Sequence, residues 1–177
     1  MSLPPRIALV GFMGSGKSTV GRLLAAQAGY AFVDSDEEIE ASQKAKISDI
    51  FRTQGEAAFR AMEAETIHRL LDREATVIAT GGGAFAQSAC ADDLLARAVT
   101  VYLSCDFAEA FGRVAHCGQG SRPLVERGVV EAEALYMERK SKYAGAHVTI
   151  DTTRRSPEQV ATDIFDCVRQ HRAANHI

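Results

Sequence analysis

The sequence has no tryptophan, few prolines and cysteines, and no long hydrophobic run. No apolar stretch approaches the ~20 residues of a membrane helix, and the short run Ile7–Val10 passes into glycines too soon for a secretory signal. The four cysteines form no CxxC pair, so we expect free thiols rather than a zinc site or a disulfide framework; they are Cys90, Cys105, Cys117 and Cys167. These absences favour a cytoplasmic protein.

An excess of charge of one sign is also missing. The chain carries 20 Lys and Arg against 23 Asp and Glu, a net charge of −3. A broad basic surface is therefore not expected, and we predict neither a nucleic-acid nor a membrane partner. Hydrophobic residues make up 46% of the 177 positions. This suits one domain with a full core and leaves little room for a second. We therefore predict a single domain over residues 1–177 and a monomer.

Short β-rich runs alternate with longer helical patterns, which is typical of an α/β fold with a parallel sheet. A helix is predicted over Glu56–Asp72 from the spacing of its apolar residues. Another is predicted to follow Ser156, because Pro157 suits the first helical position. The predicted strands are mostly apolar, as strands covered on both faces are: Ile7–Val10, Ala31–Asp34, Thr76–Ala79, Val99–Leu103 and His147–Ile150.

The most specific motif follows the first predicted strand. The segment from Gly11 to Ser18 matches the P-loop pattern GxxxxGK[ST] and precedes a helical pattern. Its glycines let backbone N–H groups turn toward phosphate oxygens, and the helix N-terminus adds the positive end of its dipole. Lys17 is expected to neutralise the β- and γ-phosphates, and Ser18 to offer its hydroxyl to Mg²⁺. The motif predicts an ATP or GTP site.

A P-loop alone does not choose a reaction. The chain lacks the Asn-Lys-x-Asp segment with which GTPases select guanine. It also lacks the Asp-Gly-aromatic-Pro-Arg stretch of adenylate-type kinases, and ATPase machines usually need a longer chain. These absences leave a compact kinase for a small acceptor.

Two acids stand where the second predicted strand ends. Ligands of open α/β sheets gather at this end of a strand, and Asp34 and Asp36 both lie there. Phosphoryl transfer to an alcohol needs one acid near the metal and one to accept the hydroxyl proton. The same residues also suit the first turn of a helix, which favours acidic side chains. The two interpretations are compatible.

Taken in order, these motifs resemble the shikimate kinase family over nearly the whole chain. The P-loop and Asp34-x-Asp36 are followed by Ile47-x-x-Ile50-Phe51, Gly55-Glu56-x-x-Phe59-Arg60-x-x-Glu63, Gly81-Gly82-Gly83, Arg122-Pro123-Leu124, Arg139 with Tyr143, and Asp151-Thr152 ahead of Arg155 and Pro157. The resemblance implies a P-loop NTPase fold like that of nucleoside monophosphate kinases, a three-layer α/β sandwich with a five-stranded parallel sheet. It also implies ATP and Mg²⁺ as cofactors, and phosphorylation of the 3-hydroxyl of shikimate to give shikimate 3-phosphate and ADP.

The resemblance further implies a role for each matching position. The catalytic residues would be Lys17, Asp36 and Arg122, and the metal ligands Ser18 and Asp34, the latter through water. The nucleotide would contact Gly14, Ser15, Gly16, Lys17, Ser18, Thr19, Arg113, Arg122, Arg155 and Pro157. Shikimate would contact Asp36, Arg60, Gly81, Gly82, Gly83 and Arg139, with the two arginines on its carboxylate. A substrate-binding segment (about 34–62) and a lid (about 114–126) would close over the site.

Some of these residues have simpler interpretations. Arg60 also suits a surface ion pair with Glu56 or Glu63 at helical spacing. The run Gly81–Gly83 also suits a flexible turn with left-handed backbone. The segment from His116 to Ser121 fits an ordinary surface loop as well as a mobile lid.

Four positions depart from the family pattern, and two other functions stay open. Gln43-Lys44 stands where Thr-Gly is expected, Ser141 where proline is frequent, and His147 near the place of an acidic residue. The alternatives are a gluconate-type sugar-acid kinase and a non-catalytic nucleotide-binding regulator. Arg60 and the glycine run argue against the first, while intact Lys17, Asp36 and Arg122 argue against the second.

Overall fold

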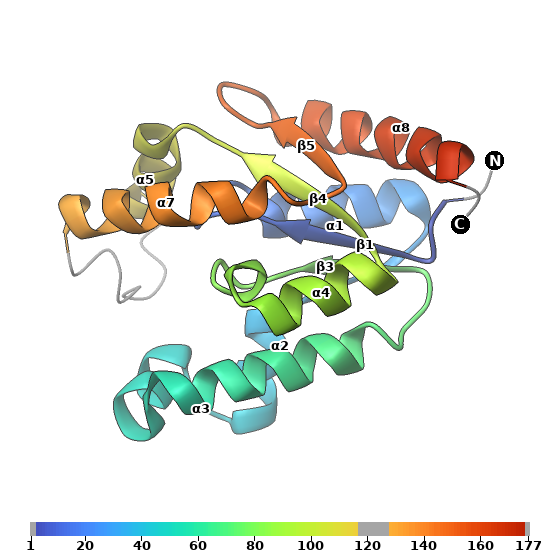
Figure 1. The fold of residues 1–177 in the computed structure, drawn as a ribbon. Coiled ribbons are helices and arrows are strands. Elements are labelled where there is room, and N and C mark those ends of the chain that lie inside the picture. The colour runs from blue at the N-terminus through green and yellow to red at the C-terminus, as the bar shows by residue number, and fades with distance from the viewer. Residues whose placement is uncertain (1–2, 117–127, 176–177) are drawn as a thin grey trace.

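Five short apolar segments form one parallel sheet in the computed structural model, which describes residues 3–116 and 128–175 (Figure 1). The strand order is β2-β3-β1-β4-β5, and every neighbouring pair is parallel. The strands are β1 (Arg6–Val10), β2 (Ala31–Asp34), β3 (Thr76–Ala79), β4 (Val99–Ser104) and β5 (Val148–Asp151). Each predicted strand is confirmed to within one residue at either end, and so is the five-stranded parallel sheet.

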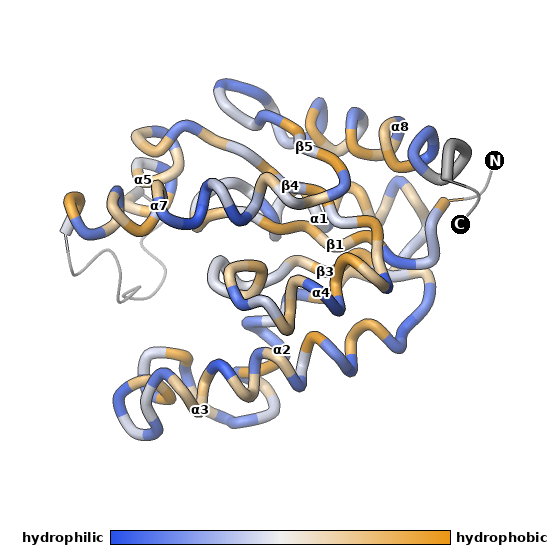
Figure 2. The backbone as a smooth tube through the Cα atoms, in the orientation of Figure 1, coloured by the Kyte–Doolittle hydropathy of each residue, from blue (hydrophilic) through white to orange (hydrophobic). Residues whose placement is uncertain are grey.

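The alternation of side chains along β1 explains the two faces of the core. Ile7 and Leu9 pack on one face with residues of α1 and α8, and Ala8 and Val10 pack on the other with residues of α3, α4 and α7. All four are fully buried because helices cover both faces. Figure 2 shows β1 as a hydrophobic stretch at the centre of the molecule.

The helices complete the outer layers of the sandwich (Figure 1). They are α1 (Lys17–Ala28), α2 (Ser35–Gln43), α3 (Ile47–Leu70), the short 3-10 helix η1 (Ala84–Ala86), α4 (Ser88–Arg97), α5 (Phe107–His116), α7 (Val129–Tyr143) and α8 (Pro157–Asn175). The predicted start of α8 is confirmed: the backbone N–H of Gln159 donates to Oγ of Ser156, and Pro157 is the first helical residue. None of the helices in the described ranges combines the length and apolar character needed to cross a membrane.

The prediction for α3 was incomplete. The helix begins at Ile47 rather than Glu56, and it ends at Leu70. Gly55 interrupts it with φ 81° and ψ 172°, so α3 is two helical stretches joined at a kink. The predicted start coincides with the second stretch, and the first was missed because its apolar spacing is broken at this glycine.

Helix α2 and the first part of α3 have a small core of their own. Ile39, Ile50 and Phe59 are buried together, apart from the two clusters that cover the sheet. Figure 1 shows this part of the chain projecting from the sheet. It coincides with the predicted substrate-binding segment.

Candidate active site

The loop after β1 is built for close packing against neighbouring backbone. Gly14 and Gly16 have positive φ angles, 74° and 95°. A Cβ atom at Gly14 would lie 2.0 Å from the carbonyl oxygen of Ala110 in α5, and one at Gly11 would lie 2.7 Å from that of Leu103. Only glycine fits at either position. The loop leads directly into α1, which begins at Lys17 after Gly16, so the N-terminus of this helix adjoins the loop.

Lys17 and Ser15 contribute polar groups to this loop. The ammonium of Lys17 donates to the carbonyl oxygens of Gly11 (2.8 Å) and Phe12 (2.9 Å), so it lies across the loop. Ser15 is 1% exposed, and its hydroxyl has no hydrogen-bond partner among the residues that the structure describes. Thr19 is exposed on the first turn of α1. A cradle of this shape and polarity suits a polyphosphate.

The two predicted metal ligands are brought together. The hydroxyl of Ser18, on α1, donates to Oδ2 of Asp34, at the end of β2, at 2.6 Å. Oδ1 of Asp34 accepts from the N–H of Asp36 and caps α2. The interpretation of this acidic pair as the start of a helix is therefore confirmed, while its roles at the metal and as base stay predictions. Hydroxyl and carboxylate oxygens side by side at a P-loop are the hard donors that Mg²⁺ prefers, so the residues present fit that ion.

Asp36 is held next to the glycine run that follows β3. Oδ1 of Asp36 and Oε1 of Glu63 would each lie 2.6 Å from a Cβ atom at Gly81. The hydroxyl of Ser35, which is fully buried, accepts from the N–H of Gly81 at 2.9 Å. Two carboxylates thus approach bare backbone at one point, where any side chain would displace them.

Arg60 reaches the same run from α3. Its Nη1 would lie 2.3 Å from a Cβ atom at Gly83. Glu63 and Glu56 accept from this guanidinium at 2.8 and 3.1 Å, so the ion pairs expected of a surface residue do form. Glu63, however, is 1% exposed. Burial lowers the pKa of Arg60, but the hydrogen bonds to Glu63 and Glu56 outweigh it and the pKa is raised.

Arg139 and Tyr143 approach the run from α7. Nη1 of Arg139 donates to the carbonyl oxygen of Gly82 at 3.1 Å, and the Tyr143 hydroxyl donates to the same oxygen. Burial raises the pKa of Tyr143 to about 12. Its hydroxyl therefore stays protonated and remains a donor at neutral pH.

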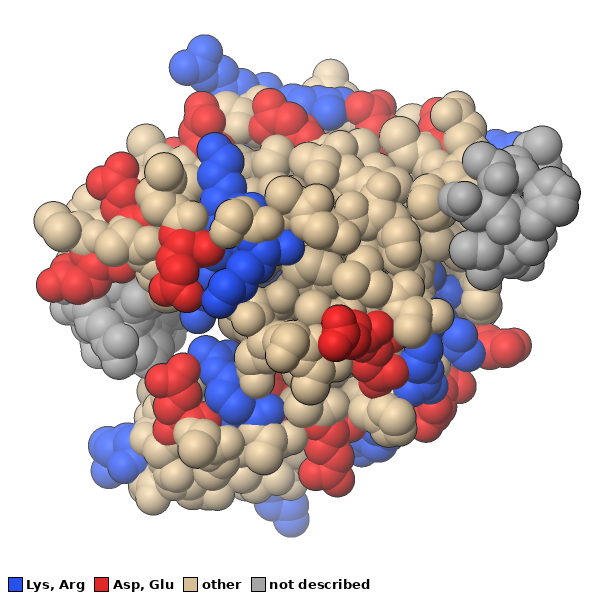
Figure 3. Space-filling view, viewed as in Figure 1, with Lys and Arg blue, Asp and Glu red and all other residues tan. Residues whose placement is uncertain are grey.

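The glycine run is where the predicted acceptor-binding residues converge. None of Gly81, Gly82 and Gly83 has positive φ. The expected alternative, a left-handed flexible turn, is therefore wrong. At Gly81 and Gly83, carboxylates and a guanidinium approach the backbone so closely that a Cβ atom would displace them, whereas a Cβ atom at Gly82 would make ordinary contacts of 3.6 Å or more. In Figure 3 the surface is hollowed between the part formed by α3 and the part formed by α7, with Lys and Arg on both sides of the hollow.

A second group of residues lies beside the P-loop. Arg113, on α5, donates to the carbonyl oxygen of Gly14 at 3.3 Å and to that of Thr152 at 3.0 Å. Its guanidinium also pairs with Glu109 at 2.5 Å. Arg113 therefore links the loop that would hold phosphates to the loop that follows β5.

Arg155 lies on that second loop, next to a hollow of about 510 Å³ at the start of α8. Its guanidinium donates to the carbonyl oxygen of Asp151 at 3.2 Å and to the carboxylate of Asp163 at 2.6 Å. Pro157 begins α8 two residues later. Arg113 thus contacts the P-loop backbone, while Arg155 lies on the loop after β5 and Pro157 at the start of α8. Their contact with a nucleotide base stays a prediction.

Arg122 and Cys117 lie outside the described residues, as does most of the predicted lid. Its first positions, residues 114–116, form the end of α5.

Three residues with contacts in this site had been given no role from the sequence. Ser35 binds the Gly81 backbone, Glu63 binds Arg60, and Glu109 binds Arg113. Ser35 lies between the two acids of a quoted motif, and that position was its only signal. Glu63 had been named only as a possible ion-pair partner of Arg60. Glu109 lies four residues before Arg113, at helical spacing, but its other partner, Arg154, is 45 residues away, so the link between α5 and the loop after β5 left no signal in the sequence.

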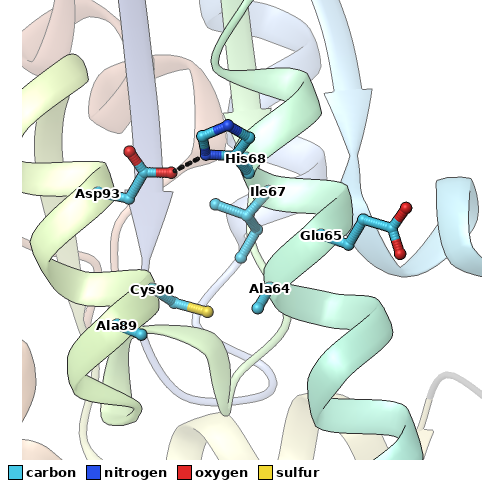
Figure 4. A pocket seen from close by; sticks show the side chains of 7 residues that line it. All are labelled: Ala64, Glu65, Ile67, His68, Ala89, Cys90 and Asp93. Carbon is cyan, nitrogen blue, oxygen red and sulfur yellow. Dashed lines mark hydrogen bonds and ion pairs between the residues drawn. The ribbon is translucent and has the colours of Figure 1, made fainter.

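A further hollow lies between α3 and α4 (Figure 4). It has a volume of about 450 Å³, and on its wall Nδ1 of His68 lies within hydrogen-bond distance of Oδ2 of Asp93, at 2.9 Å. Burial raises the pKa of Cys90, on its wall, to about 11, so this thiol is unreactive at neutral pH. No predicted site residue lines this hollow. We therefore place the candidate active site at the P-loop and the glycine run.

Comparisons with known proteins agree with the geometry. The family model described as "Shikimate kinase" matches residues 13–169. The chain is 41% identical to a shikimate kinase of Persephonella marina, covering 92% of this chain and 98% of that protein. It is 43% identical to one of Halorhodospira halophila, covering 94% of each.

Solved structures show the same similarity. A shikimate kinase from Acinetobacter baumannii, in complex with shikimate, superposes with a TM-score of 0.89 at 38% identity and covers 94% of each chain. A shikimate kinase structure from Aquifex aeolicus superposes with a TM-score of 0.80 at 34% identity, covering 96% of this chain and 99% of that one. A gluconokinase from Sinorhizobium meliloti superposes with a TM-score of 0.61 at 18% identity, covering 96% of this chain and 94% of that one. At this identity the similarity is one of fold alone.

Proposed function

The chain belongs to the shikimate kinase family and is an ATP-using kinase of the shikimate pathway, and on that premise we propose which of its residues carry the reaction. The acceptor is shikimate, phosphorylated at its 3-hydroxyl, and the products are shikimate 3-phosphate and ADP. The observation that carries the proposal is the convergence of Asp36, Arg60 and Arg139 on Gly81–Gly83, beside the P-loop.

The acceptor is bound at the glycine run. A carboxylate is matched by the planar forks of Arg60 and Arg139, which approach the run from α3 and α7. Glu63 and Glu56 hold Arg60, so little of its conformational freedom is lost on binding. Hydroxyl groups of the acceptor are oriented by Asp36 and by the backbone of the glycines.

The transfer itself needs a base and neutralisation of charge. Asp36 accepts the proton of the 3-hydroxyl while the hydroxyl oxygen bonds to the γ-phosphorus and the bond to the bridging oxygen of ADP breaks. Lys17 and the α1 N-terminus neutralise charge on the β- and γ-phosphates, and Arg122 does so from the lid. Ser18, and Asp34 through a water molecule, would hold Mg²⁺, which would supply further charge neutralisation on the phosphates.

A coupled assay of ADP release tests this function with shikimate, gluconate and nucleoside monophosphates as acceptors. We expect turnover with shikimate far above the others, and loss of that turnover in Lys17→Met with an unchanged circular dichroism spectrum. Faster turnover with gluconate would show that the acceptor is assigned wrongly. Undiminished turnover of a folded Lys17→Met variant would show that the role of the P-loop lysine is assigned wrongly.

We also propose that the enzyme is a cytoplasmic monomer. Cys90 and Cys105 are buried free thiols and Cys167 is a partly exposed one, which suits a reducing compartment. The molar mass measured by light scattering after size-exclusion chromatography tests whether the protein is a monomer.

A further inference from the structure

We propose that Glu109 is a positioning residue that sets the affinity for the base of the nucleotide, separately from its phosphates. The inference rests on the proposed function in one respect, that the base lies beside Arg113. It assigns a role to a side chain that touches neither the phosphates nor the acceptor.

Glu109 joins two parts of the chain that are far apart in sequence. It lies on the first turn of α5, half-buried. Both of its carboxylate oxygens accept from the backbone N–H of Arg154 at 3.1 Å, and Oε1 also accepts from Arg113 at 2.5 Å. The loop after β5 is thereby fastened to α5 by a charge-assisted hydrogen bond, which is stronger than a neutral one.

The backbone conformation of Arg154 indicates what the contact with Glu109 stabilises. Arg154 has a φ angle of 55°, in the left-handed region that residues other than glycine adopt at a cost. The two oxygens of Glu109 bind its N–H in that conformation. The next residue is Arg155, which we place against the base. Glu109 thus stabilises the backbone turn from which Arg155 extends.

The same carboxylate orients Arg113. The guanidinium is held by Glu109 on its own helix and by the carbonyl oxygens of Thr152 and Gly14 from elsewhere. An exposed pair at this helical spacing would contribute little. Here the pair is about two-thirds buried, with 32% and 27% of the side chains exposed, and it forms part of a network across three elements. Removing the carboxylate would therefore loosen both Arg113 and the backbone turn that carries Arg155.

The test separates the contribution of the base to nucleotide affinity from that of the phosphates, by comparing a ligand that has a base with one that has none. We would measure the dissociation constants of ADP and of inorganic tripolyphosphate by calorimetry, without acceptor, in the wild type, in Glu109→Gln and in Glu133→Gln. Glu133 is an exposed glutamate of α7 and is the matched control. We expect Glu109→Gln to bind ADP about tenfold more weakly, the loss of a charge-assisted contact, and tripolyphosphate within about twofold of the wild type. In turnover, KM for ATP rises while kcat at saturating ATP is retained.

Two results would overturn the proposal: ADP affinity equal to that of the control, or an equal loss for ADP and tripolyphosphate, which would mean that the P-loop itself is deformed. If Glu109→Gln melts well below the control, Arg113→Met provides the same comparison. The double variant should then lose no more ADP affinity than Arg113→Met alone, and additive losses would contradict the network. The calorimetric measurements use no acceptor, so they stand whether or not the chain phosphorylates shikimate.

Discussion

The carboxylate of Glu63, which is 1% exposed, lies 2.8 Å from Nη1 of Arg60. A helical ion pair that would be minor on a surface is here anchored in the interior, and Gln87 donates to the same carboxylate oxygen at 2.6 Å. Arg60 is therefore a fixed part of the structure beside the glycine run. Because Arg60 is held in place by Glu63, substitutions of Arg60 test directly how the acceptor is bound.

Arg60→Ala should lower kcat/KM for shikimate by about thirty- to a thousandfold, because one unpaired carboxylate in a closed pocket costs roughly 2–4 kcal/mol. Arg60→Lys should also be costly, since a point charge does not reproduce the fork. Affinity for ADP without acceptor should barely change. Steady-state kinetics with shikimate and its carboxamide, in the wild type and in Arg60→Ala, provide the measurement.

The matched control is Arg52→Ala, an exposed arginine of α3 that pairs with Asp49. Its kinetics should equal those of the wild type. A further variant, Arg60→Ala with Glu63→Gln, should recover stability lost in Arg60→Ala, because no buried charge is then left without its arginine. If wild type and Arg60→Ala discriminate acid from amide equally well, Arg60 does not bind the carboxylate.

Asp36→Asn should lower turnover by about a hundred- to ten-thousandfold while nucleotide affinity is retained, because the amide is unable to accept the hydroxyl proton. Glu37→Gln is the control: this neighbour is exposed and pairs with Arg22. Rapid-quench kinetics and calorimetry with ADP separate the two effects. A variant that mainly loses nucleotide affinity would instead place Asp36 at the metal.

The stability of the protein should fall in mildly acidic solution because of His147. His147 is exposed overall, but partial desolvation of its ring lowers its pKa from 6.5, and the nearby His171 lowers it further. The folded protein therefore binds fewer protons than the unfolded chain, and this contribution, complete above about pH 6.5, is lost as pH falls toward the folded pKa. His147→Asn keeps an acceptor for the N–H of Thr100, which now donates to Nδ1 at 3.1 Å.

Urea unfolding at pH 5.5, 6.5 and 7.5 measures the effect. We expect a smaller decrease of the unfolding free energy toward pH 5.5 in His147→Asn than in the wild type. Equal slopes for the two proteins would exclude His147 as the source.

Lys44→Gly should stabilise the fold. Lys44 ends α2 with a φ angle of 51°, at one of the two positions where the family pattern led us to expect Thr-Gly. Relief of the left-handed strain exceeds the added entropy of the unfolded chain, for a net gain of about 0.5–1 kcal/mol, or about 1–4 °C in melting temperature. Calorimetry should show a lower melting temperature for the control variant Gln43→Gly, at the last helical residue of α2. A lower melting temperature in both variants would refute the explanation.

Local physics made much of the molecule predictable. The glycines and Lys17 of the P-loop, the five apolar strands and the start of α8 at Pro157 each depend on a few neighbouring residues. All of these appear in the structure within a residue of their expected places. Asp34 and Asp36 were also foreseeable, since parallel strands direct their carboxyl ends to one edge. The kink of α3 at Gly55 was missed, because a glycine within a helix does not reveal its φ angle.

The order of the strands and the contacts between distant segments were decided by tertiary structure. Placing β3 between β2 and β1 brings Ser35 to Gly81, 46 residues away, and packing α5 on the P-loop brings Arg113 to Gly14, 99 residues away. Such contacts carry no periodicity, because each depends on which elements happen to be neighbours in the sheet. The sequence by itself therefore determined the reaction class and most of the residues proposed to carry it. The packing of the helices on the sheet determined which buried side chains hold those residues in place.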